Sequence, residues 1–208
     1  MEDQKLLLVV EDVPGIRELL ELTLRFKNYE VVSAVDGQEA LQMMENRRPA
    51  AVVTDILMPR MDGFSLLYHL RKDEGMRDIP VVFLSATYVS PEDKDFARTL
   101  GAARFIEKPI DIEKFLHTIQ EVLDEPPVAP PPLLKETEFL QKYQIRLDAK
   151  LEQKNAQIAR AQRLLQTATP TETTGFEASL RQALHERQAI EVELDNVQQI
   201  LQGRASTQ

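Results

Sequence analysis

The chain has 208 residues and a net charge of −9, and 43% of its residues are hydrophobic, which is enough for a sizeable core. It contains no Cys, which excludes disulfides, thiolate metal sites and a Cys nucleophile. No apolar run reaches the roughly 18 residues of a membrane-spanning helix, and the N-terminus lacks a signal-peptide pattern, so we expect a cytoplasmic protein that does not enter a membrane.

The charge is distributed unevenly along the chain. Residues 1–125 carry 15 Lys or Arg and 24 Asp or Glu, whereas residues 133–208 carry 10 of each kind. Neither part is basic, which argues against nucleic acid as the main partner, and we expect no direct DNA binding. The second part also lacks a basic recognition helix, which argues against a transcription-factor output.

A proline-rich segment divides the chain. Five prolines lie among residues 125–132, which read EPPVAPPP. Such a composition favours an extended polyproline II strut, and residues 126–132 would span roughly 20 Å. We therefore predict a first domain at residues 1–125, a linker at 126–132 and a second region at 133–208.

Before the prolines, short apolar runs alternate with helical patterns. The apolar runs predict strands at residues 5–10, 30–34, 51–55, 79–85 and 103–107. The 3.6-residue spacing predicts helices at residues 15–27, 38–46, 63–74, 91–100 and 110–123, with Gly101 ending the fourth. This alternation predicts an α/β domain, a doubly wound five-stranded parallel sheet of order 2-1-3-4-5. The first, third and fourth strands are the most continuously apolar and should be central.

Polar residues follow the predicted strands at the points where they end. Glu11 and Asp12 follow the first strand, Asp55 ends the third, Ser85 ends the fourth and Lys108 follows the fifth. The carboxyl ends of parallel strands lie at one edge of a sheet, so these side chains should converge. Clustered carboxylates repel one another unless a hard cation such as Mg²⁺ lies among them. With an ammonium and a hydroxyl for phosphoryl oxygens, the pattern predicts a phosphoryl-accepting aspartate.

Residues 1–125 resemble the receiver domain of two-component response regulators, the CheY-like family. The resemblance rests on the acidic pair Glu11-Asp12, on Asp55 in the stretch DILMPRMDG, on Ser85, and on Lys108 before a Pro. It implies a flavodoxin-like fold and a phospho-acceptor signalling protein rather than an enzyme with a separate substrate. The phosphoryl group on Asp55 would come from a histidine kinase or a phosphotransfer protein, and the family's Mg²⁺-dependent self-phosphorylation and self-dephosphorylation would follow.

The resemblance also implies roles for individual residues. Asp12, Asp55 and the backbone carbonyl of Leu57 would bind Mg²⁺, with Glu11 acting directly or through water. Phe105 falls at the family's aromatic switch position. After phosphorylation, Ser85 would move toward the phosphate and Phe105 would turn inward. The Lys108–Pro109 bond is expected to be cis, and the family's usual first acid, Asp, is replaced here by Glu11.

The second region carries apolar residues at heptad spacing in two segments, 133–167 and 176–202. Pro170 and Gly175 should break the chain between them, which predicts an all-α antiparallel coiled-coil hairpin. Its register would pair Leu147 with Leu194 and Leu165 with Phe176. The same register places two cations, Lys154 and Arg187, in one layer, where carboxylates such as Glu152, Glu186 or Glu191 would pair with them, or where their side chains would extend out of the seam to solvent.

Two helices bury little surface, so we expect a homodimer of hairpins through residues 133–202. A hairpin that packs on its own receiver, or a long helix that binds another protein, is the alternative. The main functional hypothesis is a phosphorylatable response regulator with a helical output. A constitutive protein-binding scaffold and a phosphorelay intermediate that uses His185 are the alternatives.

Overall fold

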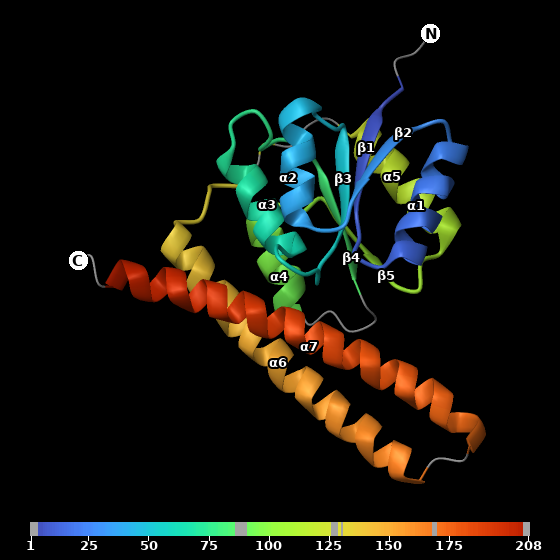
Figure 1. Ribbon diagram of the computed structural model, residues 1–208. Helices are drawn as coiled ribbons and strands as arrows, with labels where there is room; N and C mark the ends of the chain where they lie inside the picture. Colours follow the sequence, from blue (N-terminus) through green and yellow to red (C-terminus); the bar gives the residue numbers. More distant parts are fainter. Residues whose placement is uncertain (1–3, 86–90, 126–128, 130, 168–169, 206–208) are drawn as a thin grey trace. The chain divides into compact units, whose positions relative to one another are not determined.

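A computed structural model describes residues 4–85, 91–125, 129, 131–167 and 170–205 (Figure 1). The chain forms two compact units, residues 1–134 and 135–208, and each is described separately. Most of the predicted linker, residues 126–128 and 130, and the first two residues of the predicted hairpin turn, 168 and 169, lie outside the described residues.

The first unit is an α/β fold with a five-stranded parallel sheet of order β2-β1-β3-β4-β5, as predicted. The strands are β1 (Leu6–Val10), β2 (Glu30–Ala34), β3 (Ala51–Asp55), β4 (Val81–Ser85) and β5 (Arg104–Glu107). The helices are α1 (Pro14–Phe26), α2 (Gly37–Asn46), α3 (Gly63–Lys72), α4 (Pro91–Leu100) and α5 (Ile112–Asp124). Helices α1 and α5 cover one face of the sheet, and α2, α3 and α4 cover the other (Figure 1).

The central strands are the most apolar ones, which confirms the prediction. Every residue of β1 and β4 is buried, and in β3 only the terminal Asp55 is partly exposed. On one face, Leu20 of α1 and Phe115 of α5 belong to a fully buried cluster. On the other face, the Phe64 ring lies 4.9 Å from that of Phe83 and 5.3 Å from that of Phe96.

Local side-chain and backbone contacts determine where the helices begin and end. The Asp62 side chain accepts a hydrogen bond from the backbone N–H of Ser65 at 2.8 Å and begins α3. This helix ends at Lys72, two residues earlier than predicted, because the Asp73 carboxylate accepts a hydrogen bond from the Gly75 N–H and turns the chain. Gly101, at φ +83°, follows α4 as predicted, since Gly adopts the left-handed conformation without strain.

Helix α1 has two apolar faces. It buries Leu20 and Leu24 against the sheet. Leu19, Leu22 and Phe26 stay on its surface, and Phe26 is 86% exposed. Exposed apolar side chains at this helical spacing form a stripe that the core does not use.

The second unit is a hairpin of two long helices packed together, α6 (Glu136–Thr167) and α7 (Pro170–Ala205). Helix α6 begins three residues later than predicted and carries Glu136 and Glu138 in its first turn, where acidic side chains favour a helix N-terminus. Helix α7 begins six residues earlier than predicted. Pro170 therefore starts the helix instead of breaking the chain, because Pro is well suited to the first helical position. Gly175 is also helical, so the turn is shorter than expected.

The predicted seam is largely buried. Its buried members are Leu140, Leu147, Ile158, Ala161, Ala183, Ile190, Leu194 and Val197. Tyr143 is also fully buried, and its ring stacks on Phe139 at 5.3 Å; the heptad pattern did not predict this pair.

The two seam cations are paired with carboxylates, the first of the two alternatives. Lys154 forms an ion pair with Glu186 of the other helix, and Arg187 lies 3.4 Å from Glu191.

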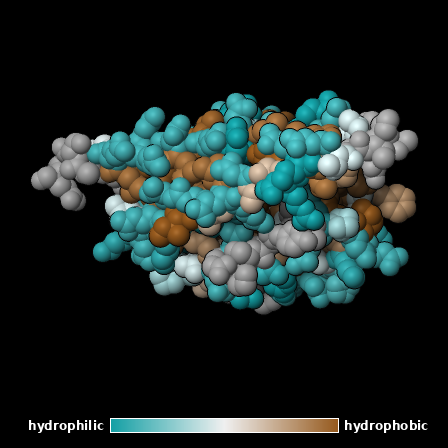
Figure 2. Space-filling view, turned by 90° about the horizontal axis from the view of Figure 1, so that it is seen from below, coloured by the Kyte–Doolittle hydropathy of each residue, from teal (hydrophilic) through white to brown (hydrophobic). Residues whose placement is uncertain are grey.

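Large apolar side chains also remain on the surface of the hairpin. They are Ile145, Leu164, Val192 and Ile200, and Ile145 is 70% exposed. From below, apolar side chains are visible between the hydrophilic ones (Figure 2). No helix in the described part of the chain is long and apolar enough to cross a membrane.

Candidate phosphoryl-acceptor site

Three carboxylates lie together at the carboxyl edge of the sheet. Strands β1 and β3 are parallel neighbours that pair Val10 with Thr54, so the residues that follow them are brought side by side. Glu11, Asp12 and Asp55 can each offer one oxygen within 4.8 Å of the others. Glu11 is fully buried, and the other two are partly buried.

Lys108 joins this cluster from the end of β5. Its Nζ lies 2.8 Å from Glu11 Oε2 and 3.2 Å from Asp55 Oδ2. Its backbone N–H donates to the Ser85 carbonyl at 2.7 Å, and the Lys108–Pro109 peptide is cis. One cation is therefore shared between two of the three carboxylates.

The pKa values of Asp55, Glu11 and Lys108 reflect their burial and their closeness to one another. Burial raises the pKa of Asp55 to about 6, and the Glu11 charge adds to this effect while Lys108 opposes it. Burial also raises the pKa of Glu11, again against the effect of Lys108. For Lys108, burial alone would lower the pKa, but the charges of Asp55 and Glu11 raise it above the usual value. The ammonium is thus held firmly as a cation.

The donor set fits a hard divalent cation. It offers three carboxylate groups within 4.8 Å of one another, and their like charges favour a bound cation. A cluster of oxygen ligands that leaves room for waters and a phosphate oxygen suits Mg²⁺. Leu57 is two residues beyond Asp55, and a role for its carbonyl stays a prediction.

Ser85 ends β4, the strand next to β3. It is 1% exposed, and its hydroxyl has no hydrogen-bond partner among the described residues. Phe105 lies on β5, and its half-buried ring is 5.4 Å from that of Phe83. A buried hydroxyl with no partner is costly unless a ligand uses it, so Ser85 is available to an incoming group.

Gly63 is a functional residue that the pattern of polar residues did not identify. A Cβ at Gly63 would lie 2.3 Å from the backbone oxygen of Asp55. The Gly63 N–H donates to the Ile56 carbonyl at 2.9 Å, which draws the loop of residues 56–62 back onto the end of β3. The Asp-Gly pair before the third helix was the available signal, because a backbone contact this close admits only Gly.

A second such residue is Arg17, whose Nη1 donates to the Glu11 carbonyl at 2.7 Å and anchors the acidic pair. The spacing of apolar residues along α1 gave no indication of this contact. By contrast, His185 is exposed on α7 and lies in the other unit, and its use in a phosphorelay stays a prediction.

A doubly wound sheet with an acidic triad, a lysine and a hydroxyl at its carboxyl edge defines a phospho-accepting signalling module. Residues 7–120 match the family described as response regulator receiver domain, and the chain belongs to that family. Solved structures agree. A putative response regulator from Chloroflexus aurantiacus aligns with a TM-score of 0.56 at 30% identity, over 59% of this chain and all of its own.

Two further solved structures share this fold. The chemotaxis protein CheY4 of Vibrio cholerae aligns with a TM-score of 0.55 at 33% identity, over 58% of this chain and 99% of its own. The receiver domain of the sensor histidine kinase PA1611 from Pseudomonas aeruginosa, solved with a magnesium ion in its active-site cleft, aligns with a TM-score of 0.55 at 26% identity, over 59% of this chain and all of its own.

Curated relatives match a similar share of the chain. The "DNA-binding dual master transcriptional regulator RpaA" of Synechocystis is 32% identical over 117 residues, which are 56% of this chain and 48% of that protein. The "Response regulator MprA" of a Mycobacterium species is 36% identical over 129 residues, 60% of this chain and 55% of its own. The chain thus spans about half the length of these relatives. The family match ends at residue 120, before the helical hairpin.

Proposed function

We propose that the protein is a response regulator whose Asp55 accepts a phosphoryl group from a histidine kinase or a phosphotransfer protein. An oxygen of Asp55 attacks the phosphorus of a phosphohistidine and a P–O bond forms. The P–N bond breaks, and its electron pair leaves with the imidazole, which is neutral when its second nitrogen carries a proton. With a pKa of about 6, Asp55 is mostly ionised at neutral pH, as attack requires.

The observation that carries this proposal is the position of Lys108 between Glu11 and Asp55. Ser85, whose hydroxyl has no hydrogen-bond partner among the described residues, ends β4, the strand next to that of Asp55. Both groups can bind phosphoryl oxygens, which would explain a cation and a buried hydroxyl at the carboxyl edge that holds Asp55. Glu11, Asp12, Asp55 and the Leu57 carbonyl would hold Mg²⁺, which when bound neutralises charge on the incoming phosphoryl group. Ser85 and Phe105 would then shift toward the phosphorylated site.

Phosphorylation can be tested without knowledge of the kinase. The full chain is incubated with Mg²⁺ and acetyl phosphate, and its intact mass is measured. We expect one added phosphoryl group in the parent chain and none in Asp55→Asn. Asp95→Asn, which changes an exposed carboxylate on α4, is the matched control and should behave as the parent does. Uptake that persists in Asp55→Asn, or no uptake in the parent, would contradict the proposal.

The phosphodonor is expected to dock on α1, the helix that follows the acidic pair. Its exposed apolar stripe, Leu19, Leu22 and Phe26, lies on that helix. We expect Phe26→Glu to slow phosphotransfer from a histidine-phosphorylated kinase at least tenfold, because an apolar contact is replaced by a charge. The reaction with acetyl phosphate, which needs no docking surface, is the internal control and should be unchanged. Equal slowing with both donors would rule out a docking role.

For the output we propose self-association of the hairpin as a coiled coil in a cytoplasmic homodimer. The charges of residues 133–208 balance, unlike those of a DNA-binding region, and Ile145 leaves an apolar side chain on the hairpin surface. Sedimentation equilibrium with and without beryllium fluoride tests this proposal. We expect a dimer that Ile145→Glu dissociates and Gln157→Glu, an exposed polar control, does not. A monomer at tens of micromolar in both states would refute dimerisation but not phosphorylation.

A further inference from the structure

A second pocket, of about 620 Å³, lies at the amino-terminal edge of the sheet. Its lining includes the residues directly before four strands, namely Lys5, Ala50, Pro80 and Ala103. Because the strands are parallel, Asp55 lies at the opposite edge, roughly 15 Å away along strands of this length. The pocket is therefore separate from the phosphoryl-acceptor site.

The lining of this pocket is strongly basic. Its charged members are Lys5, Arg48, Arg71, Arg77, Arg98 and Arg104, with only Asp78 and Glu125 opposing them. This local excess of four positive charges stands in a stretch, residues 1–125, in which acidic residues outnumber basic ones by 24 to 15. A concave positive site on an otherwise negative surface concentrates small anions.

Some of these cations are already engaged in ion pairs that shape the rim. Arg48 lies 2.6 Å from Asp78, and Arg104 is paired with Glu125. Lys5 donates to the Leu123 carbonyl at 3.0 Å. A guanidinium has five N–H donors, so these pairs leave donors available on both arginines.

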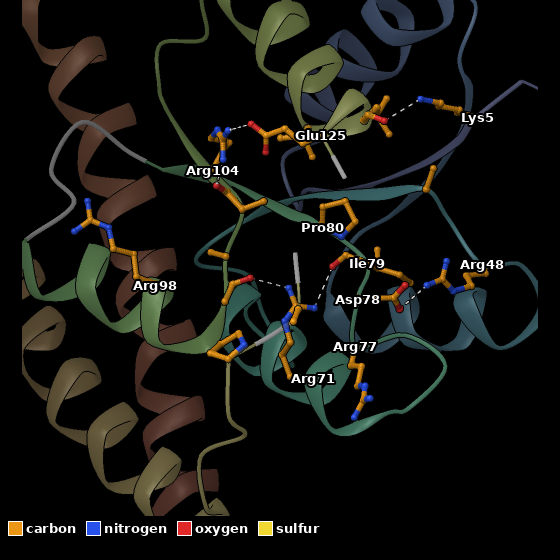
Figure 3. A pocket seen from close by; sticks show the side chains of 18 residues that line it. Lys5, Arg48, Arg71, Arg77, Asp78, Ile79, Pro80, Arg98, Arg104 and Glu125 are labelled. Atoms are coloured by element: carbon orange, nitrogen blue, oxygen red, sulfur yellow. Dashed lines mark hydrogen bonds and ion pairs between the residues drawn. The ribbon is translucent and has the colours of Figure 1, made fainter. Parts of the chain in front are cut away.

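Arg71 is the buried cation of the pocket. The residue is 8% exposed, and its guanidinium is fixed by hydrogen bonds from Nη1 to the Ile79 carbonyl at 3.0 Å and from Nη2 to the Gly101 carbonyl at 2.7 Å (Figure 3). Its Nε is buried and has no hydrogen-bond partner within the described parts of the chain. Burial lowers its pKa to about 10, so it is still a cation at neutral pH. An unpaired donor on a buried cation is costly and suits a site that receives an acceptor.

Two exposed arginines border the pocket. The Arg77 side chain makes no hydrogen bond or ion pair with any residue that the structure describes, and Arg98 pairs with Asp95 of its own helix, at the surface. Figure 3 shows both side chains turned away from Arg71, and their length allows them to rotate over a bound anion. Three guanidiniums can therefore act together, and their planar forks match phosphoryl oxygens.

Apolar residues form the rest of the wall. Pro80, Val122 and Pro131 are among them, and a Cβ at Gly101 would lie 2.6 Å from Pro131 Cδ and 3.2 Å from Arg71 Nε. Pro131, Gly101 and Arg71 thus meet at one corner of the pocket. The volume falls within the roughly 300–1,000 Å³ of small-molecule sites, in which apolar walls surround a few polar groups.

We propose that this pocket binds a phosphorylated small molecule of nucleotide size, with its phosphoryl oxygens on Arg71, Arg77 and Arg98 and its apolar body against Pro80 and Pro131. Several cations around a pocket of this volume favour a diphosphate over a single carboxylate. Pro131 belongs to the segment that leads to the second unit, so a bound ligand would contact that segment directly. The site would be a second input to the protein, independent of Asp55.

Calorimetric titration of the full chain tests the proposal, with ADP, pyrophosphate and adenosine as probes at fixed ionic strength. The titration is repeated with Asp55→Asn protein in the presence of a chelator, so that a metal ion at the acidic site cannot contribute to binding. We expect saturable binding of ADP, weaker binding of pyrophosphate and no measurable binding of adenosine. Arg77→Gln should weaken ADP binding about fivefold and Arg71→Lys about tenfold, the effect of losing one charge-assisted hydrogen bond.

The control is Arg47→Gln. Arg47 is adjacent to Arg48, is equally exposed and is also ion-paired, but it does not line the pocket, so ADP binding should be unchanged. If Arg71→Lys does not fold, as its thermal melt would show, Arg77→Gln and Arg98→Gln still decide the question. Absence of saturable ADP binding in the millimolar range would overturn the proposal. An ADP affinity that is the same in all of these arginine variants as in the parent would also overturn it. An acidic peptide that binds where ADP does not would show that the ligand class is wrong.

Discussion

The Nζ of Lys108 lies 3.2 Å from an oxygen of Asp55, across the edge of the sheet from β5 to β3. The same nitrogen is 2.8 Å from Glu11. One ammonium therefore offsets two of three carboxylates, which leaves the cluster with excess negative charge until a metal ion or a phosphoryl group changes the balance. Several measurable properties depend on this arrangement.

Replacement of Asp55 by Asn should stabilise the metal-free protein at neutral pH. Folding raises the pKa of Asp55 from 3.8 to about 6, so the native state binds the proton more tightly than the unfolded state does. Below about pH 4 the Asp55 carboxyl is protonated in both states and does not lower the free energy of unfolding. As the pH rises from about 4 to above 6, the unfolded state loses this proton more readily than the native state, so the free energy of unfolding falls. That pKa difference corresponds to at most about 3 kcal/mol.

Urea unfolding in a chelator at pH 4 and pH 7.5 measures this effect. Asp55→Asn should be more stable than the parent at pH 7.5, and the difference should shrink at pH 4. Asp95→Asn, which changes an exposed carboxylate, should show little difference at either pH. An Asn variant that is less stable than the parent at pH 7.5 would contradict the assigned pKa.

Removal of the Lys108 charge should tighten Mg²⁺ binding. Lys108→Gln deletes a cation that contacts two of the three candidate ligands, so the carboxylates attract a divalent ion roughly tenfold more strongly. Calorimetric titration with MgCl₂ gives the affinity. Lys114→Gln, which changes an exposed lysine of α5, is the control and should have no effect. Weaker binding in Lys108→Gln would indicate that the lysine organises the site rather than competing with the ion.

Gly63→Ala should destabilise the protein by about 3 kcal/mol or more, because its Cβ would lie 2.3 Å from the Asp55 backbone oxygen and force the backbone to move. Gly15→Ala is the matched control. Gly15 lies in α1 with nothing within 4 Å of its Cβ position, so Ala should be neutral or stabilise by up to about 1 kcal/mol. Denaturant unfolding measures the stability of both variants. An equal change in stability would show that the backbone at Gly63 accommodates a Cβ without strain.

The Lys154–Glu186 ion pair should couple the two long helices. Both side chains are mostly buried, at 19% and 26% exposed, so a double-mutant cycle with Lys154→Met and Glu186→Gln should give a coupling of about 1 kcal/mol. The Lys142–Glu138 pair within α6 is half exposed, and its cycle should give about 0.3 kcal/mol. A coupling near zero for Lys154 and Glu186 would mean that the helices do not depend on this pair.

Much of the site was predictable because it depends on local pattern. Apolar runs that end at a polar residue place that residue at a strand end, and the parallel order of the strands brings Asp12, Asp55, Ser85 and Lys108 to one edge. The hairpin was predictable in the same way from its heptads. The position of Pro170 was misjudged, because a Pro between two helical patterns breaks a helix or begins one according to where the preceding turn ends.

The sequence by itself therefore determined the order of strands and helices, the edge at which the acidic residues meet, and the helical nature of the second unit. These features depend on burial and on short-range periodicity. Only the tertiary structure decided that Lys108 pairs with Glu11, 97 positions away, that Gly63 touches the Asp55 backbone, and that arginines from five segments surround one pocket. Such contacts depend on how loops pack in space, and no local window of sequence specifies those distances.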